Sequence, residues 1–179
     1  MPLRDDWTSA AELIRRIDKS TSARACKLEI LLVDDGSVQP PELNDFRGPF
    51  SVINRVRILR LRRNLGHQRA IAIGMVHVYK SMPCDALVVM DADGEDTADG
   101  VVRLLDAFNG SEAVFAERSR RTESFVFRFF YALYKALHRA FTGTAVKVGN
   151  FSILPARYLD TLVVTSELWN HYAASVFRS

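Results

Sequence analysis

The chain has 179 residues, of which 48% are hydrophobic and 25% are charged, and its formal net charge is +3 at pH 7. This length and composition indicate one globular domain with a real hydrophobic core and exclude a disordered polypeptide. The small positive charge, without a zinc-finger, helix-turn-helix or RNA-binding signature, argues against a nucleic-acid partner.

The predicted elements alternate between helices and strands along the chain. A helix is expected over 9–19, where Ser9 and Glu12 have the spacing of a capping box. The remaining expected elements are, in chain order, strand 28–33, strand 56–61, helix 67–80, strand 86–90, helix 98–108 and a strand near residue 113. This alternation predicts an α/β fold with a mainly parallel sheet and helices on both of its faces.

The first polar turn follows the strand expected over 28–33 and reads Asp34-Asp35-Gly36-Ser37. Gly36 permits a tight turn, and the two carboxylates can accept hydrogen bonds from a base or a ribose. Ligands of open α/β sheets bind beyond the carboxyl ends of the strands, where this turn lies. An ordinary structural turn explains the same residues, so both interpretations stay open at this point.

The second polar turn precedes the helix expected over 67–80. Asn64 and Gly66 suit a turn with unusual backbone angles, and the start of the helix with its flanking arginines is a natural anion site. Gly74, with a second small residue one turn earlier, predicts close packing of this helix on a sheet. His67 is interpreted either as a ligand-binding residue or as an ordinary core or capping histidine.

The third polar turn, Asp91-Ala92-Asp93, follows the apolar run 86–90. Alternate residues of an extended chain point the same way, so Asp91 and Asp93 can face one ligand together. Two neighbouring carboxylates repel each other unless a cation lies between them, and a hard divalent cation would also bind substrate phosphates. The alternative is a solvated acidic turn that caps the next helix.

Four sequence blocks occur in the order and spacing of a known family: LLVDDGS, RRNLGHQRAIAIGM, LVVMDADGEDTAD, and the pair FAERSRR with VGNFSILPARYLD. In these blocks, from about residue 28 to 162, the chain resembles glycosyltransferase family 2, the inverting GT-A type. It is most similar in pattern to bacterial polyprenyl-phosphate sugar transferases related to dolichol-phosphate mannose synthase. The resemblance implies a GT-A fold, in which a Rossmann-like, mainly parallel sheet carries helices on both faces.

The resemblance also implies which residues bind the donor, a nucleoside-diphosphate sugar. The nucleotide-binding residues would be Asp34, Asp35, Asn64, Gly66 and Asp91. A UDP-sugar is the expected donor, with GDP-mannose as the alternative. The reaction would invert the configuration of the anomeric carbon.

A metal ion and an acceptor are implied in the same way. Asp91, Asp93 and Glu95 would hold Mg²⁺ or Mn²⁺ against the diphosphate, with Asp93 as the catalytic ligand. Arg118 and Arg121, the other expected catalytic residues, would hold the phosphate of a polyprenyl-phosphate acceptor, a role that suits the planar fork of arginine. A hydroxyl acceptor would instead require a base, for which Glu95 or Asp96 is the candidate.

The expected setting is cell-envelope glycan synthesis in the cytoplasm, at the inner face of the plasma membrane. Two cysteines without a CxxC pair predict a reducing compartment. The segment 125–141 combines aromatic and basic residues, which predicts either peripheral membrane contact by an amphipathic helix or a core helix with a solvated basic stripe. A homo-oligomer is compatible with these features.

Departures from the family pattern lead to a further expectation. Pro2 matches the proline that ends the family's first strand, but the strand before it is absent, and Ser179 ends the chain where family members continue. We therefore expect residues 1–179 to form a single GT-A catalytic domain that is incomplete at both ends, with the first strand missing. Glu95 stands where the family has Gln, and Asn150 where it has Asp.

Three alternatives remain at this stage. The DxDG sequence from Asp91 is also the start of haloacid-dehalogenase-type phosphatases, although their motif lies near the N-terminus and does not have Glu at the fifth position. A nucleotidyltransferase would need a glycine-rich GxGxR loop, which the sequence lacks. A truncated or degenerate domain that binds nucleotide without activity is the third alternative.

Overall fold

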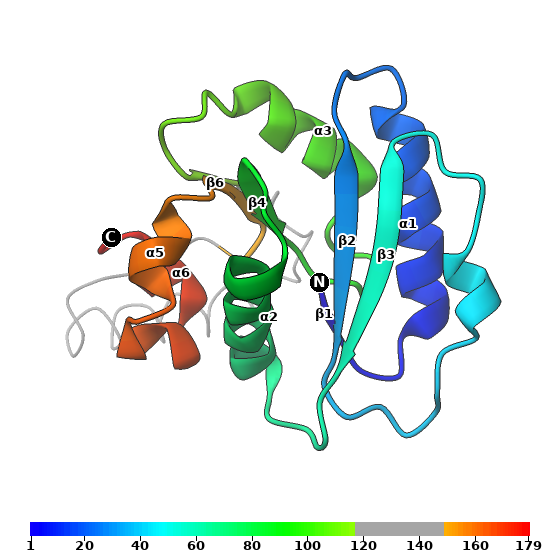
Figure 1. The fold of residues 1–179 in the computed structure, drawn as a ribbon, viewed down its shortest axis with the longest axis horizontal. Helices are drawn as coiled ribbons and strands as arrows, with labels where there is room; N and C mark the ends of the chain where they lie inside the picture. Colours follow the sequence, from blue (N-terminus) through cyan, green and yellow to red (C-terminus); the bar gives the residue numbers. More distant parts are fainter. Residues whose placement is uncertain (117–148) are drawn as a thin grey trace, which may run out of the picture.

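The computed structural model describes residues 1–116 and 149–179, in which two three-stranded sheets are packed against helices (Figure 1). The predicted α/β class is confirmed. Arg118, Arg121 and the segment 125–141, to which the sequence assigns acceptor binding and membrane contact, lie outside the described residues.

The first sheet is parallel, in the order β1-β2-β3, and consists of β1 (Pro2–Leu3), β2 (Leu28–Asp34) and β3 (Ile53–Arg60). The strand expected to be missing is represented by the two residues of β1, which pair with Val33 and Asp34 of β2. The ladder extends to Met1, whose amino group donates to the carbonyl of Leu31 at 2.9 Å. Burial lowers the pKa of this amine to about 5.

The second sheet is antiparallel, in the order β4-β6-β5, and consists of β4 (Ala86–Val89), β6 (Ser152–Pro155) and β5 (Val114–Phe115). β6 runs against both of its neighbours, so the expected parallel arrangement applies to the first sheet only. All four residues of β6 are buried, as is typical of a central strand covered on both faces.

Two helices cover one face of the sheets. These are α1 (Trp7–Thr21) and α3 (Ala98–Ala107), which also pack against each other. Ile14 of α1 packs against Leu32 of β2, while Val101 and Leu104 of α3 share a cluster with Ile153 of β6. The expected capping box is wrong, because α1 begins two residues before Ser9 and its N-cap makes no side-chain hydrogen bond.

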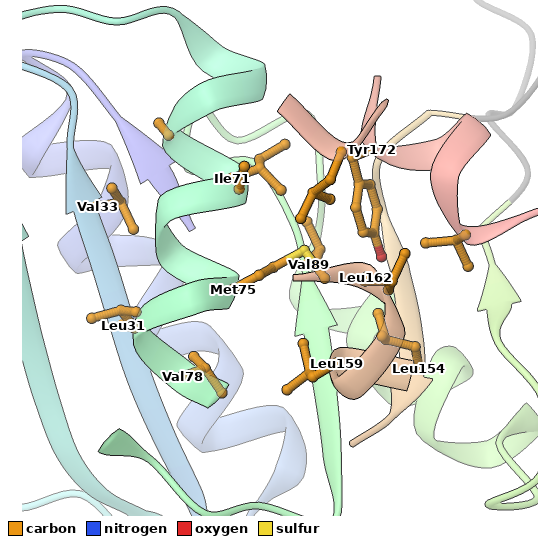
Figure 2. Close-up of a cluster of buried hydrophobic side chains, with 14 of the residues drawn as sticks. Leu31, Val33, Ile71, Met75, Val78, Val89, Leu154, Leu159, Leu162 and Tyr172 are labelled. Atoms are coloured by element: carbon orange, nitrogen blue, oxygen red, sulfur yellow. The ribbon is translucent and has the colours of Figure 1, made fainter. Parts of the chain in front are cut away.

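The opposite face is covered by α2 (His67–Ser81) and by the C-terminal elements α5 (Tyr158–Leu162), η2 (Ser166–Trp169) and α6 (Tyr172–Val176). Leu31 and Val33, the neighbours of Leu32 in β2, point to this face, as the period of a strand requires. Figure 2 shows α2 between these two side chains and those of Leu162 and Tyr172. Each such buried aliphatic side chain contributes about 1.5–3 kcal/mol to folding.

Helix α2 lies close to β2, as the sequence predicts. A Cβ atom on Gly74 would stand 2.9 Å from Cγ2 of Val33, so the absence of a side chain allows this approach. The remaining short element is η1 (Leu43–Phe46), which lies beside α1. Within residues 1–116 and 149–179, no helix is both long and apolar enough to cross a membrane.

Candidate active site

A pocket of about 280 Å³ lies where the loops that follow β1, β2, β3 and β4 meet. In a parallel α/β arrangement this is the end of the sheet at which ligands bind. Its lining residues are Pro2, Leu3, Arg4, Asp6, Asp35, Asn64, Gly66, His67, Asp91, Ala92 and Asp93. The pocket therefore brings together Asp35, Asn64, Gly66, Asp91 and Asp93 of the predicted site residues, but neither Asp34 nor Glu95.

Asp34 ends β2 and is fully buried. Its Oδ1 accepts the backbone N–H of Ser37 at 2.7 Å, and its Oδ2 accepts Nε of Arg60 at 2.9 Å. The carboxylate thus closes the turn and is paired with a cation from the neighbouring strand. Asp34 is not among the residues that line the pocket, and its predicted contact with a nucleoside stays a prediction.

Asp35 binds the loop that leads into α2. Its two carboxylate oxygens accept the backbone N–H groups of Leu65 at 2.7 Å and Gly66 at 2.9 Å. These donors belong to the region that the sequence predicts as an anion site, so the anion bound by these two amides is a side chain of the protein itself. Asn64 adds an acceptor for the N–H of Gly66 at 2.9 Å.

The turns after β2 and β3 are in direct contact through Gly36. Its φ is +75°, and a Cβ atom at this position would lie 2.6 Å from the backbone nitrogen of Asn64. Gly66, with φ of +92°, provides the second left-handed residue of this region. The conformation of the Asp35 side of the pocket therefore depends on glycine at two places.

The turn after β4 is closed by its own carboxylates. The backbone N–H of Asp91 donates to Oδ2 of Asp96 at 2.7 Å, and the N–H of Glu95 donates to Oδ1 of Asp93 at 2.9 Å. Asp91 is partly buried and Asp93 is exposed, and both line the pocket. Asp91 also faces His67, whose Nε2 lies 3.3 Å from Asp91 Oδ1.

Asp91 and Asp93 are the pocket carboxylates that would hold a divalent cation together with a substrate, since no closed protein cage is formed by the described residues. No three His, Cys, Asp or Glu side chains gather into a metal-binding group in the described part of the chain. Glu95 does not line the pocket, so the expected set Asp91, Asp93 and Glu95 is not assembled here. Mg²⁺ commonly takes one or two carboxylates and completes its shell with phosphates and water, which Asp91 and Asp93 could support.

A connected set of side chains extends from His67 to the C-terminal helices. The Nδ2 atom of Asn150 lies 2.9 Å from His67 Nε2, and its Oδ1 atom accepts a hydrogen bond from Gln68 Nε2 at 3.3 Å. Gln68 Oε1 accepts the backbone N–H of Tyr172 at 2.8 Å. The Tyr172 hydroxyl pairs with Ser152 at 2.7 Å in the interior, and its burial raises the pKa of the phenol well above the usual value.

The family model of the glycosyl transferase family 2 proteins matches residues 3–161, which is most of the chain. The chain belongs to glycosyltransferase family 2. The match includes every described strand apart from Pro2 of β1, and every residue that lines the pocket apart from the same Pro2.

Named relatives of this family 2 chain agree with the match. The undecaprenyl-phosphate 4-deoxy-4-formamido-L-arabinose transferases of Erwinia tasmaniensis and Klebsiella pneumoniae (strain 342) are each 30% identical to it, over 69% and 72% of the chain and over 37% and 38% of their own lengths. A Bacillus subtilis protein named as glycosyltransferase CsbB is 28% identical over 83% of the chain and 44% of its own length. The chain thus spans less than half the length of these relatives.

In this family 2 domain, the sequence leaves the role of one residue open and does not predict the contacts of two others, Gln68 and Asn150. The sequence leaves His67 open to a ligand role or a structural one, and the structure places it in the pocket lining. The contacts of Gln68 and Asn150 were not predicted, since 82 residues separate the two side chains in the sequence. Gln68 and Asn150 both lie in sequence blocks that match the family, which is the only sign in the sequence that they matter. The blocks do not say how far apart the two side chains lie in the fold.

Proposed function

We propose that this chain carries the donor-binding and metal-binding part of an inverting glycosyltransferase that uses a nucleoside-diphosphate sugar and a polyprenyl-phosphate acceptor. The observation on which this rests is the shared pocket of Asp91, Asp93, Asn64 and His67 at the carboxyl ends of the strands. The names of two relatives, which are transferases acting with undecaprenyl phosphate, support the acceptor class. A UDP-sugar is the first donor to test.

The proposed residue roles follow from the positions of the side chains. Asp91 and Asp93 would hold Mg²⁺ or Mn²⁺, which when bound neutralises the charge of the diphosphate leaving group. Asn64 lines the same pocket and would bind the donor through its side-chain amide, whereas the N–H of Gly66 is already bound to Asp35 and Asn64. Asp35 keeps their loop in place through its hydrogen bonds to Leu65 and Gly66.

The bond changes of the proposed reaction balance without a further reactant. The bond between the anomeric carbon and the β-phosphate oxygen of the donor breaks, and the nucleoside diphosphate leaves with that electron pair. A phosphate oxygen of the lipid forms the new bond from the opposite side, which inverts the anomeric carbon. Because the attacking oxygen is already anionic, no general base is needed, and Arg118 and Arg121 are proposed to hold the lipid phosphate.

A transfer assay with the 179-residue chain tests this proposal. UDP-sugars and GDP-mannose, labelled in the sugar, are incubated with undecaprenyl phosphate and Mn²⁺, and the label is followed into the organic phase. The proposal predicts lipid-linked label and stoichiometric nucleoside diphosphate. Release of free sugar would contradict the acceptor, and donor binding without turnover would favour the alternative of a nucleotide-binding domain without activity.

A further inference from the structure

The loop between β1 and α1 supplies Arg4 to the pocket, and among the described residues this is the only lysine or arginine in the lining. Four of the other lining residues are aspartates. The side chain of Arg4 is 53% exposed, and its one ion pair within residues 1–116 and 149–179 is with Oδ2 of Asp5, 4.0 Å from Nε. Its guanidinium donates no hydrogen bond in this part of the chain, so its donors are available to a ligand in the pocket.

The residue that follows Arg4 has a strained backbone. Asp5 has a φ of +58°, and it is the only residue other than glycine with a positive φ in the described part of the chain. Aspartate and asparagine adopt this left-handed conformation more readily than most side chains, but at a cost. Such conformations persist where the surrounding structure fixes them, and they are concentrated at functional sites. Asp5 lies between the two residues that this loop contributes to the pocket, Arg4 and Asp6.

Hydrogen bonds to the segment after β2 fix the conformation of Asp5. Its Oδ1 accepts the backbone N–H groups of Val38 at 2.8 Å and Gln39 at 3.3 Å, and its own N–H donates to Oγ of Ser37 at 2.8 Å. Nε1 of Trp7, two residues further along, donates to the carbonyl of Gln39 at 2.9 Å. The strained residue is therefore held on its backbone and on its side chain by one neighbouring segment.

The charges of the lining indicate what Arg4 does there. A diphosphate that enters the pocket meets several carboxylates, and a cation at Asp91 and Asp93 offsets part of the repulsion. Arginine offers a permanent charge and a planar fork of donors that matches phosphate oxygens.

We propose that Arg4 binds the diphosphate of the ligand and that Asp5 is a positioning residue, whose left-handed conformation keeps Arg4 at the pocket. The inference rests on the proposed function for the identity of the donor. The ligand chemistry that it requires, a diphosphate, is tested separately from the nucleoside.

Calorimetric titration with pyrophosphate and with UDP, each in the presence of Mn²⁺, tests the role of Arg4. Arg4→Gln should weaken the binding of both ligands by a similar factor, about tenfold or more, because both carry the diphosphate. The control Arg103→Gln, at an exposed position of α3 outside the pocket, should change neither.

Each other outcome is decisive. Unchanged binding in Arg4→Gln, or a loss for UDP without a loss for pyrophosphate, would overturn the proposal. Pyrophosphate binding that depends on Arg4, in a chain that binds neither UDP nor GDP, would support Arg4 and contradict the proposed function. A folded chain that binds none of these ligands would contradict both.

Substitutions of Asp5 separate positioning from charge. Removing a carboxylate beside Arg4 would by charge alone strengthen the binding of pyrophosphate, whereas positioning predicts weaker binding in Asp5→Ala. Asp5→Asn should not weaken it, because asparagine adopts the same conformation and its Oδ1 can accept both N–H groups.

The double variant Arg4→Gln/Asp5→Ala should bind no more weakly than Arg4→Gln, since Asp5 acts through Arg4. Asp5→Gly, which permits the backbone conformation but removes the acceptor, replaces Asp5→Ala if the alanine variant does not fold. Undiminished binding in the folded variant, or losses that add in the double variant, would overturn the role of Asp5.

Discussion

At the scale of single residues, Asp35 shows how a pocket carboxylate can act on the protein rather than on a ligand. It is 5% exposed, and both of its oxygens accept backbone N–H groups from the loop before α2. Hydrogen bonds to a charged acceptor are about twice as strong as those between neutral groups. Asp35 therefore stabilises the loop that carries Asn64 and Gly66.

Replacing Asp35 with alanine should lower the free energy of unfolding by about 1–3 kcal/mol, because two partly buried amides lose their acceptor. Urea unfolding measures the change. Asp35→Asn keeps one acceptor and should lose less, and Asp99→Ala, at an exposed position in α3, should change stability little. An unchanged midpoint for Asp35→Ala would show that the loop does not depend on this carboxylate.

The buried phenol of Tyr172 leads to the prediction that the free energy of unfolding falls at alkaline pH. Burial raises the pKa of its phenol in the folded chain, whereas the unfolded chain loses the proton near pH 10. Below about pH 10 both states hold the proton, and above it only the folded state does, so folding stability falls as the pH rises. The expected slope from this group is about 1.4 kcal/mol per pH unit.

Tyr172→Phe removes this titration and should flatten the alkaline decline, at the cost of about 1 kcal/mol at neutral pH for the lost bond to Ser152. Urea midpoints between about pH 8 and 11 measure both effects. Tyr79→Phe, at a residue that is 49% exposed, serves as the control. An equally steep decline in Tyr172→Phe would contradict the assignment.

The positions of the acidic residues could be predicted, but their partners could not. Apolar runs followed by Asp34, Asp35, Asp91 and Asp93 identify strand ends from periodicity alone. Which amide each carboxylate accepts depends on the path of two loops, which local sequence does not encode. The same holds for Asn150, whose contact with the pocket depends on the antiparallel return of β6.

At the scale of elements, the strands and helices were largely predictable because their apolar periods are clear. The start of α1 was misplaced because its register is determined by packing, with Trp7 buried beside Phe46, rather than by a cap. Two residues were enough to form β1, because the carbonyl and N–H groups of β2 bind them. The strand propensity of two residues does not include the energy that they gain by hydrogen bonding to a neighbouring strand.

The contact between the turns after β2 and β3 gives a prediction at this scale. Gly36→Ala should destabilise the chain by about 2–4 kcal/mol, since it combines backbone strain with a clash against the nitrogen of Asn64. Gly110→Ala is the matched control, because Gly110 has a similar φ of +79° and no atom within 4 Å of the added carbon.

The control Gly110→Ala should lower the free energy of unfolding by about 1–2 kcal/mol through backbone strain alone. The difference between Gly36→Ala and Gly110→Ala then measures the cost of the clash with Asn64. Thermal or urea unfolding of both variants gives the result. Equal losses would show that the two turns can separate without cost, and the Asp35 side of the pocket would then not be held by their contact.

At the scale of the whole molecule, the pocket is assembled from segments distant in sequence. The loops after β2 and β3 supply Asp35 and Asn64, α2 supplies His67, and the loop after β4 supplies Asp91 and Asp93. Helix α2 lies between this sheet and the C-terminal helices, and its first turn contacts both the pocket and Tyr172 (Figure 2). The membership of the chain in glycosyltransferase family 2 agrees with this arrangement.

The central claim is that Asp91 and Asp93 bind a nucleoside diphosphate through a divalent cation, and calorimetry tests it most directly. UDP and GDP are titrated into the chain with and without Mn²⁺, and into Asp93→Ala and the control Asp99→Ala. The account predicts that one of the two nucleotides binds and that its binding requires Mn²⁺. Asp93→Ala should weaken this binding at least about tenfold, which is a loss of about 1.4 kcal/mol, and Asp99→Ala should leave it unchanged. A folded chain that binds neither nucleotide, or an Asp93→Ala variant that binds as well as the unsubstituted chain, would contradict it.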